Sequence, residues 1–369
     1  EIDYAIHPRT KVRSSTQPLH RLSEQDFWLE TLKPLLFKVT EHDPQIAHEL
    51  FVHLSRGVYH LGLEDFLLNN PTNTKYVPFE LSNAAGFNKN GDIPPTVLFY
   101  LGFDRVIIGT VTMDPWLGNP RPTIRRYSPS ESMINWMGLP GEGVEIVAEN
   151  LAAYGEHPVP LTINIMSTPQ KKSDDVLRDL EKTVLTMRNV HSVDRFELNI
   201  SCPNTHSTTG ELDAREQYQQ QLEEMLVVVE ENMNPHQKLY LKVSPNLTLS
   251  EIKETVAIAK KHRVHGITAT NTSTVHDRHY IPFSPMKEGK QIGGASGNAV
   301  YSRSLETQKK FARMAAEADV QWEFIACGGI NSLERVKERA TAGAKGIQIY
   351  TPLIFSGPKM VRMLRQYQA

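Results

Sequence analysis

Apolar residues at helical spacing open the patterned part of the chain. They form two stripes of the kind that amphipathic helices carry, namely Phe27, Leu29, Leu32, Leu35, Leu36 and Val39, then Ile46, Leu50, Phe51, Leu54, Val58 and Leu61. The stripes predict a helical segment over residues 23–70. Residues 1–22 mix charges with Pro8 and Pro18, which favours an irregular arm.

Beyond a loop at residues 69–74, short apolar runs alternate with longer helical patterns. Eight runs occur, at residues 79–86, 105–112, 161–165, 196–202, 238–244, 266–271, 324–328 and 346–350. Helical patterns separate most of them, at residues 143–154, 176–188, 217–232, 249–262, 304–317 and 332–342. Alternating strands and helices are typical of parallel sheets, so we expect an α/β fold, a (β/α)8 TIM barrel over residues 71–369.

Polar residues stand at the carboxyl ends of these runs, where barrel enzymes place their chemistry. A single Asn or Thr there is usually a turn former or a helix cap. Eight coincident cases instead favour a large flat ligand with many hydrogen-bonding edges. The polar ends are Asn83 and Lys89, Thr110 and Thr112, Asn164, Asn199 to Asn204, Lys242 and Ser244, Thr270 to Thr272, Gly328 and Gly329, and Tyr350 and Thr351.

Glycine turns near the last two runs predict a phosphate site. Gly293-Gly294-Ala295-Ser296-Gly297 precedes the seventh run, Gly328-Gly329 ends it, and Tyr350-Thr351 ends the eighth. Barrels commonly bind phosphate at this place, because backbone N–H groups at glycine turns approach a dianion unobstructed. The alternative is that the glycines only permit tight turns.

Two lysines and one cysteine are candidates for chemistry. Lys89 and Lys242 lie at or near strand ends, where a buried ammonium needs an anionic partner unless it is solvated at the rim. Cys202 follows a strand end and is flanked by amide side chains, which favours a thiolate that takes a proton. Cys327 lies within a strand and is expected to be a small buried hydrophobe.

Composition excludes several classes of protein. A net charge of −2 provides no broad basic field, so no nucleic-acid partner is expected, and a small molecule is the better default. Two distant cysteines exclude a disulfide framework and favour an intracellular protein, and they suggest neither an iron–sulfur relay nor another metal site. No apolar run is long enough to span a membrane. The chain begins at Glu1 rather than Met, which leaves open an anchor removed before it.

Several motifs in register resemble the dihydroorotate dehydrogenase family over residues 40 to 360. They are Asn83-Ala84-Ala85-Gly86-Phe87-Asn88-Lys89-Asn90-Gly91, Gly109-Thr110-Val111-Thr112, Gly118-Asn119-Pro120-Arg121-Pro122, Asn199-Ile200-Ser201-Cys202-Pro203-Asn204-Thr205, Thr270-Asn271-Thr272, Gly293-Gly294-Ala295-Ser296-Gly297 and Gln348-Ile349-Tyr350-Thr351. The resemblance implies FMN-dependent oxidation of (S)-dihydroorotate to orotate, a step of de novo pyrimidine biosynthesis.

The resemblance also assigns residues to the cofactor and the substrate. FMN is expected against Ala85, Gly86, Lys89, Thr110, Asn164, Asn199, Lys242 and Thr270, with its phosphate at Ser296, Gly297, Gly328, Gly329, Tyr350 and Thr351. Dihydroorotate is expected to contact Lys89, Asn135, Asn199, Asn204, Asn271 and Thr272. Cys202 would remove the C5 proton while hydride passes from C6 to the flavin.

The motifs combine two classes of this family. Cys202 resembles the base of the soluble class 1, as does Asn135-Trp136-Met137-Gly138-Leu139-Pro140, whereas the N-terminal helices with Asp43-Pro44-Gln45-Ile46-Ala47-His48 resemble the quinone-using, membrane-associated class 2. In class 2 such helices form a quinone tunnel, and Leu35, Leu36, Phe51, Leu54 and Leu61 are candidates to line one.

The acceptor and the location follow from the same helices. We expect quinone as the acceptor rather than fumarate or NAD, and peripheral contact with the inner or cytoplasmic membrane face rather than a cytoplasmic location. Alternatively, amphipathic helices cover the bottom face of the barrel. Rival functions are another FMN-barrel dihydropyrimidine or dihydrouridine oxidoreductase and a non-catalytic phosphate-binding barrel.

Overall fold

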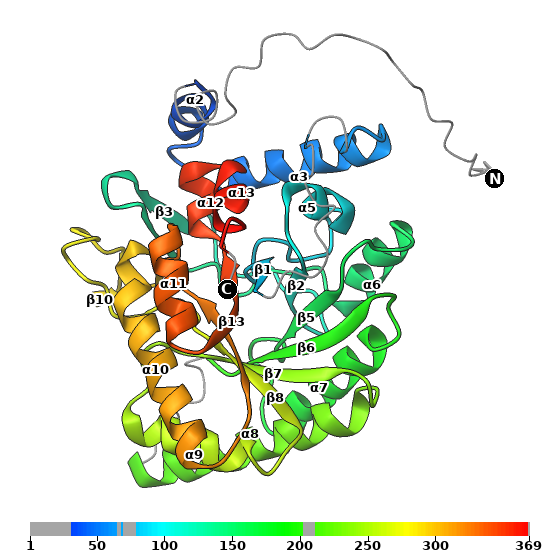
Figure 1. Ribbon diagram of the computed structural model, residues 1–369, viewed down its shortest axis with the longest axis vertical. Coiled ribbons are helices and arrows are strands. Elements are labelled where there is room, and N and C mark those ends of the chain that lie inside the picture. The colour runs from blue at the N-terminus through cyan, green and yellow to red at the C-terminus, as the bar shows by residue number, and fades with distance from the viewer. Residues whose placement is uncertain (1–30, 65–67, 69–78, 202–210, 368–369) are drawn as a thin grey trace.

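The eight apolar runs form eight parallel strands within the described part of the chain, which in this computed structural model is residues 31–64, 68, 79–201 and 211–367 (Figure 1). The strands are β1 (Glu80–Asn83), β2 (Val106–Val111), β5 (Leu161–Ile165), β6 (Val193–Asn199), β7 (Lys238–Val243), β8 (Val264–Ala269), β12 (Glu323–Cys327) and β13 (Ala344–Ile349). Their order is β1-β13-β12-β8-β7-β6-β5-β2. The predicted TIM barrel is confirmed.

Asn83 closes the barrel between its first two strands. A parallel bridge joins Ser82 to Arg105, and the Asn83 side chain donates to the carbonyl of Ile107 at 2.8 Å and accepts from its N–H at 3.0 Å. The buried amide thus replaces a rung of the ladder where the strands diverge. At this polar strand end a structural role accounts for the residue.

Helices cover the outside of the sheet and bury their apolar faces on it. They are α5 (Pro95–Leu101), α6 (Val144–Ala153), α7 (Asp174–Met187), α8 (Glu211–Asn232), α9 (Leu249–Ala259), α10 (Tyr301–Glu317), α11 (Leu333–Thr341), α12 (Thr351–Ser356) and α13 (Lys359–Leu364). The six expected helices are present, and α9 begins in a capping box in which Thr248 and Glu251 bond each other's backbone. Helix α5 was not expected, because its sequence PTVLFYL is almost uniformly apolar and has no helical period.

Short strands add a small sheet at the mouth of the barrel, where the parallel strands end. Antiparallel β3 (Ile124–Tyr127), β4 (Ser132–Asn135) and β11 (Gly294–Gly297) pair there, and β9 (Met286–Lys287) pairs with β10 (Lys290–Gln291). Single turns of 3-10 helix at Ser128–Ser130 and Asn298–Val300 flank the sheet. The β11–β4 pair brings the glycine-rich segment beside Asn135.

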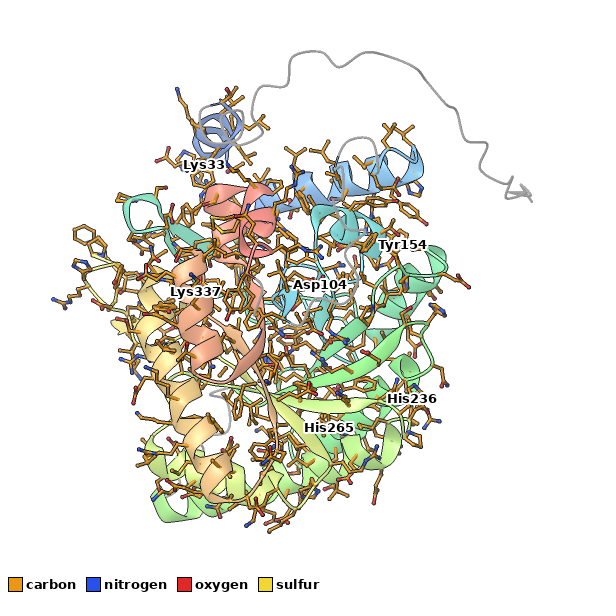
Figure 2. The ribbon with its side chains drawn as sticks, in the orientation of Figure 1. Lys33, Asp104, Tyr154, His236, His265 and Lys337 are labelled. Atoms are coloured by element: carbon orange, nitrogen blue, oxygen red, sulfur yellow. The ribbon has the colours of Figure 1, made fainter. Side chains whose placement is uncertain are left out.

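The N-terminal helices α2 (Lys33–Val39) and α3 (Gln45–His60) lie at the mouth rather than the bottom (Figure 1). Lys33 of α2 (Figure 2) donates to the carbonyl of Phe355 in α12 at 3.1 Å, and the rings of Phe37 and Phe355 contact edge to face. Arg126 of β3 donates to the carbonyl of Thr40 at 2.9 Å. The alternative of a bottom cover is therefore wrong. Residues 1–22, expected as an irregular arm, lie outside the described residues.

Candidate functional site

Strand ends β2, β5, β6, β7, β8 and β13 meet in one buried polar network. Its centre is Glu197 of β6, whose carboxylate accepts from Asn164 at 2.7 Å, Thr268 at 2.5 Å and Gln348 at 2.7 Å. Lys242 of β7 lies 3.6 Å from the same carboxylate and donates to Gln348 at 2.9 Å. Thr110 joins through Asn164 at 2.6 Å. Three expected cofactor residues, Thr110, Asn164 and Lys242, thus belong to one network.

Glu197 was missed at the sequence level, although it leaves a signal there. A carboxylate between the apolar residues Phe196 and Leu198 of a predicted buried strand needs a buried partner, since desolvation of a lone charge is costly. Lys242 is that partner, and their side chains are 1% and 4% exposed. Lys242 was expected to need an anionic partner, and the structure supplies one from within the barrel.

Amide side chains gather at the ends of β4, β6 and β8. Asn271 donates to Asn199 at 3.3 Å, and the Asn271 oxygen accepts from the N–H of Thr272 at 2.8 Å. Asn135 donates to the carbonyl of Gly294 at 3.4 Å, and a Cβ on Gly294 would come within 2.0 Å of the Thr272 hydroxyl. Four of the expected substrate residues are therefore neighbours. Cys202 and Asn204 lie outside the described residues.

Glycines form a cradle between β11, β12 and α12. Gly297, Gly328 and Gly329 have positive φ, and a Cβ on Gly297 or Gly329 would meet backbone oxygen at 2.2 or 2.5 Å. Ser296 and Thr351 meet at 2.9 Å on its wall. Among the described residues, no hydrogen bond uses the backbone N–H of Gly329, Tyr350 or Thr351 as donor. Free N–H groups in a space that admits no side chain suit a phosphate.

The β1 loop forms another wall of the mouth. The N–H of Gly86 donates to the carbonyl of Gly109 at 2.6 Å, and Gly86 faces the ring of Tyr350, which a Cβ there would approach to 3.9 Å. Ala85 precedes it in the same loop and is half-buried. Burial raises the pKa of Tyr350 to about 12, so its ring is a neutral wall. Thr270 follows β8, and its N–H donates to the carbonyl of Cys327 at 2.7 Å.

Helix α3 reaches this loop through aromatic contacts. The ring of Phe87 lies 5.5 Å from the rings of His48, Phe51 and Tyr350. Leu35, Leu54 and Leu61, three of the expected tunnel residues, are instead 60%, 60% and 72% exposed. They lie on the outer side of their helices, whereas Phe51 faces the barrel. The expected lining is wrong for these three leucines.

Lys89 lies in the loop beneath α3. The buried side chain of Asn88 fixes this loop through two hydrogen bonds to the backbone of Ile93. Burial lowers the pKa of Lys89 to about 8, although the carboxylates of Asp92 and Glu49 raise it in part. The pKa of His48 falls to about 4, because of burial first and the charge of Lys89 second. An anion that binds here would raise the pKa of Lys89 toward its usual range.

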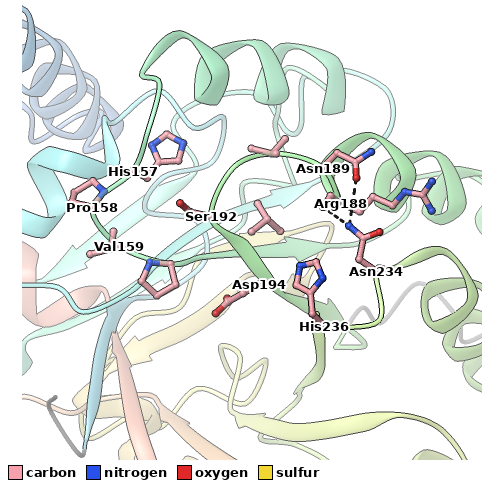
Figure 3. Close-up of a pocket in the computed structure, with 12 residues that line it drawn as sticks. His157, Pro158, Val159, Arg188, Asn189, Ser192, Asp194, Asn234 and His236 are labelled. Carbon is pink, nitrogen blue, oxygen red and sulfur yellow. Dashed lines mark hydrogen bonds between the residues drawn. The ribbon is translucent and has the colours of Figure 1, made fainter.

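Cys327 is buried beside this network, as expected of a small hydrophobe, and burial raises the pKa of its thiol. A pocket of about 590 Å³ lies at the opposite end of the barrel, where β5, β6 and β7 begin (Figure 3). His157, Ser192, Asp194 and His236 are among its lining residues. None of the expected site residues lines it, so the candidate site stays at the mouth.

Known proteins resemble this chain over most of its length. The family model for dihydroorotate dehydrogenase matches residues 72–367. The chain is 32% identical to a dihydroorotate dehydrogenase (quinone) of Acinetobacter baumannii over 89% of this chain and 96% of that one. It is 31% identical to the protein of that name from Natronomonas pharaonis, over 90% and 91%.

Solved structures show the same fold. Dihydroorotate dehydrogenase of Eimeria tenella in complex with ferulenol has a TM-score of 0.70 at 22% identity, over 88% of this chain and 90% of that one. Its ligand-free form has a TM-score of 0.71, over 88% and 93%. At this identity the likeness concerns the barrel alone.

Proposed function

Because the chain belongs to the dihydroorotate dehydrogenase family, we propose that it oxidises dihydroorotate to orotate and passes the electrons to a quinone. The position of α3 supports quinone as the acceptor. The rings of His48 and Phe51 in this helix contact Phe87, which is close in sequence to Lys89. An apolar acceptor that enters between α3 and the mouth meets the site without crossing the barrel.

The mouth fits FMN as cofactor. Ala85, Gly86, Thr110, Asn164, Lys242 and Thr270 would hold the ring and ribityl chain, with Lys89 and Asn199 at its edge, and Ser296, Gly297, Gly328, Gly329, Tyr350 and Thr351 would hold the phosphate. When bound, the flavin accepts hydride and later releases the electrons. The fit rests on the unused N–H groups of the cradle and on the positive charge of Lys242.

The amide cluster fits a pyrimidine carboxylate. Asn135, Asn199, Asn204 and Asn271 would pair with the amide edges of the ring, with Thr272 beside them. Lys89 would face the carboxylate of the substrate, whose negative charge would offset part of the free-energy cost of burying the ammonium. Cys202 would take the proton from C5, and it follows Ser201, which is fixed by bonds to Asn199 and Lys242.

The outer side of the N-terminal helices fits a membrane surface. Ile46, Leu50, Leu54 and Leu61 of the α3 segment are 47% to 72% exposed and share one face. No helix within residues 31–64, 68, 79–201 and 211–367 is both long and apolar enough to cross a membrane. We therefore propose peripheral contact, with the α3 stripe in the interface and the quinone entering from the lipid.

Anaerobic stopped-flow spectroscopy tests the proposal. Dihydroorotate should bleach the flavin absorbance of the purified protein, and a second mixing with a soluble quinone should restore it faster than fumarate or NAD does. If only fumarate or NAD restores the flavin absorbance, the oxidation of dihydroorotate stands and the assignment of quinone as the acceptor is overturned. A flavin that dihydroorotate does not bleach would overturn the substrate.

A further inference from the structure

Two arginines of α11 lie directly behind the glycine cradle. Arg335 and Arg339 stack on the ring of Tyr301, with their guanidinium carbons 4.1 and 5.1 Å from its centroid. Arg339 is completely buried, whereas Arg335 is half-buried. Neither was singled out by the sequence, since both belong to a helix that reads as an ordinary charged surface element.

Each arginine holds one carbonyl of the glycine pair. Arg339 donates to the carbonyl of Gly328 at 3.0 Å, and Arg335 donates to the carbonyl of Gly329. In a trans peptide the N–H points away from the C=O of the same unit. The two bonds therefore turn the N–H groups of Gly329 and Ile330 away from the arginines. Among the described residues, no hydrogen bond uses either N–H as donor.

Neither arginine forms an ion pair with a carboxylate within the described residues, although the charge of Glu338 raises the pKa of Arg339 in part. Arg339 donates to Gln308 at 3.0 Å and to Ser304 at 2.9 Å, and its Nε has no partner there. Arg335 also donates to Asn298, whereas the carboxylate of Glu338 accepts from Tyr301. Burial lowers the pKa of Arg339 to about 10, which leaves it charged at neutral pH. A buried cation without a counter-ion is costly, so an anion nearby would stabilise it.

We propose that Arg335 and Arg339 are positioning residues for the phosphate of the cofactor. They fix the glycine peptides so that N–H groups face the phosphate, and they supply positive charge behind it. The inference rests on the proposed function, because it takes the phosphate of FMN as the anion. It goes further by assigning phosphate affinity to side chains that do not line the cradle.

Titration of flavin-free protein with FMN and with riboflavin tests this role. Arg335→Met and Arg339→Met should each weaken FMN binding about tenfold or more, since one charge-assisted bond contributes on that scale. Riboflavin lacks the phosphate, so its dissociation constant should change less than about twofold by the same reasoning. Arg339→Lys keeps the charge and should recover part of the FMN affinity. Arg313→Met, at an exposed position of α10, is the matched control.

The outcomes separate the inference from the proposed function. Equal losses for FMN and riboflavin would reduce the arginines to a structural role, and unchanged FMN binding in Arg335→Met would overturn the inference. If Arg339→Met fails to fold by circular dichroism, Arg335→Met alone decides. A wild-type protein that binds neither flavin would overturn the proposed function instead.

Discussion

Glu197 is the residue on which the polar strand ends converge. Glu197→Gln removes the carboxylate 3.6 Å from Lys242 and leaves a buried ammonium without its counter-charge. We expect the free energy of unfolding to fall by about 3–5 kcal/mol, the range for breaking one side of a buried pair. Denaturant titration followed by circular dichroism measures the change.

The control for Glu197 is Glu223, which pairs with Lys261 at 3.1 Å on the surface and is 44% exposed. Glu223→Gln should change the free energy of unfolding by no more than about 1 kcal/mol, because solvent screens the pair. Equal effects of the two substitutions would show that the Glu197 network contributes no more than a surface ion pair.

We expect Lys89 to make orotate binding pH-dependent. Its pKa is about 8 in the ligand-free protein, and only the protonated form attracts a carboxylate. As pH rises above 8, affinity should fall by up to about tenfold per pH unit, following the protonated fraction. Lys89→Arg stays charged and should flatten the profile. Flavin-difference titration with orotate measures it, and a flat wild-type profile between pH 7 and about 9.5 would contradict the assignment.

Cys202 is the residue that we propose as the base. Cys202→Ala should keep flavin bound and slow reduction by dihydroorotate roughly 100-fold or more, the usual contribution of a general base. Cys202→Ser should keep part of the rate with a shifted pH optimum. Single-turnover bleaching measures both, and an unaltered rate in Cys202→Ala would exclude this residue.

The sequence located the polar strand ends but not their connections. Thr110, Asn164 and Lys242 could be chosen because polar groups at strand ends are unusual. The connections of Glu197 to Lys242 and Gln348 could not be predicted, because they form only when neighbouring strands place these side chains together. The roles of these residues toward ligands stay predictions.

At the scale of elements, α3 has a buried face and an exposed face, for which we propose different roles. Phe51 and Val52 face the barrel, and Leu50 and Leu54 are 47% and 60% exposed. Leu50→Glu together with Leu54→Glu should abolish binding to phospholipid vesicles while flavin reduction by dihydroorotate is retained, because charges on this face oppose insertion. Vesicle co-sedimentation measures the first and stopped-flow bleaching the second.

The matched control for the α3 face is Leu249→Glu, which alters a leucine of α9 that is 39% exposed on another element. It should leave vesicle binding unchanged. If the double α3 variant still sediments with vesicles, the exposed stripe is not the membrane contact.

The sequence predicted that α2 and α3 are amphipathic, yet not which end of the barrel they cover. Periodicity identifies one apolar side of a helix, whereas docking depends on contacts with distant residues such as Arg126 and Phe355. Short apolar segments such as α5 and the small sheet β3-β4-β11 carry too few residues for a period to emerge.

At the scale of the molecule, we expect the loss of stability in acid to depend in part on His157, which lies at the bottom of the barrel. Both ring nitrogens are buried without a partner in the described residues, and burial lowers the pKa of His157 from 6.5 to about 4. The contribution of neutral His157 to the free energy of unfolding is complete above pH 6.5 and is lost as pH falls toward 4. The reason is that the unfolded chain binds the proton more tightly than the folded protein does. The loss should be on the order of 3 kcal/mol.

Denaturant titrations of His157→Leu between pH 7.5 and about 4 measure this contribution. The variant should lose less stability on acidification than the wild type does. Parallel pH profiles for the two proteins would exclude His157 as a source of acid sensitivity. His48, whose pKa also falls to about 4, should contribute to the slope that remains, together with His265, Glu80 and Glu323, whose pKa values are lowered as well.

The position of α2 constrains the order in which the newly made chain can complete its fold. Lys33 and its hydrogen-bonding partner Phe355 are 322 residues apart. Strand β1 likewise cannot pair with β13 until β13 has been translated. At 5–20 residues per second, on the order of tens of seconds of translation separate the two partners. Throughout this interval α2 lacks the part of its docking surface that Phe355 supplies, whereas α3 already has Phe87 beside it. An incomplete chain of this kind would expose the apolar side of α2 to a holdase chaperone or to lipid, and α2 can complete its docking only when α12 has been made.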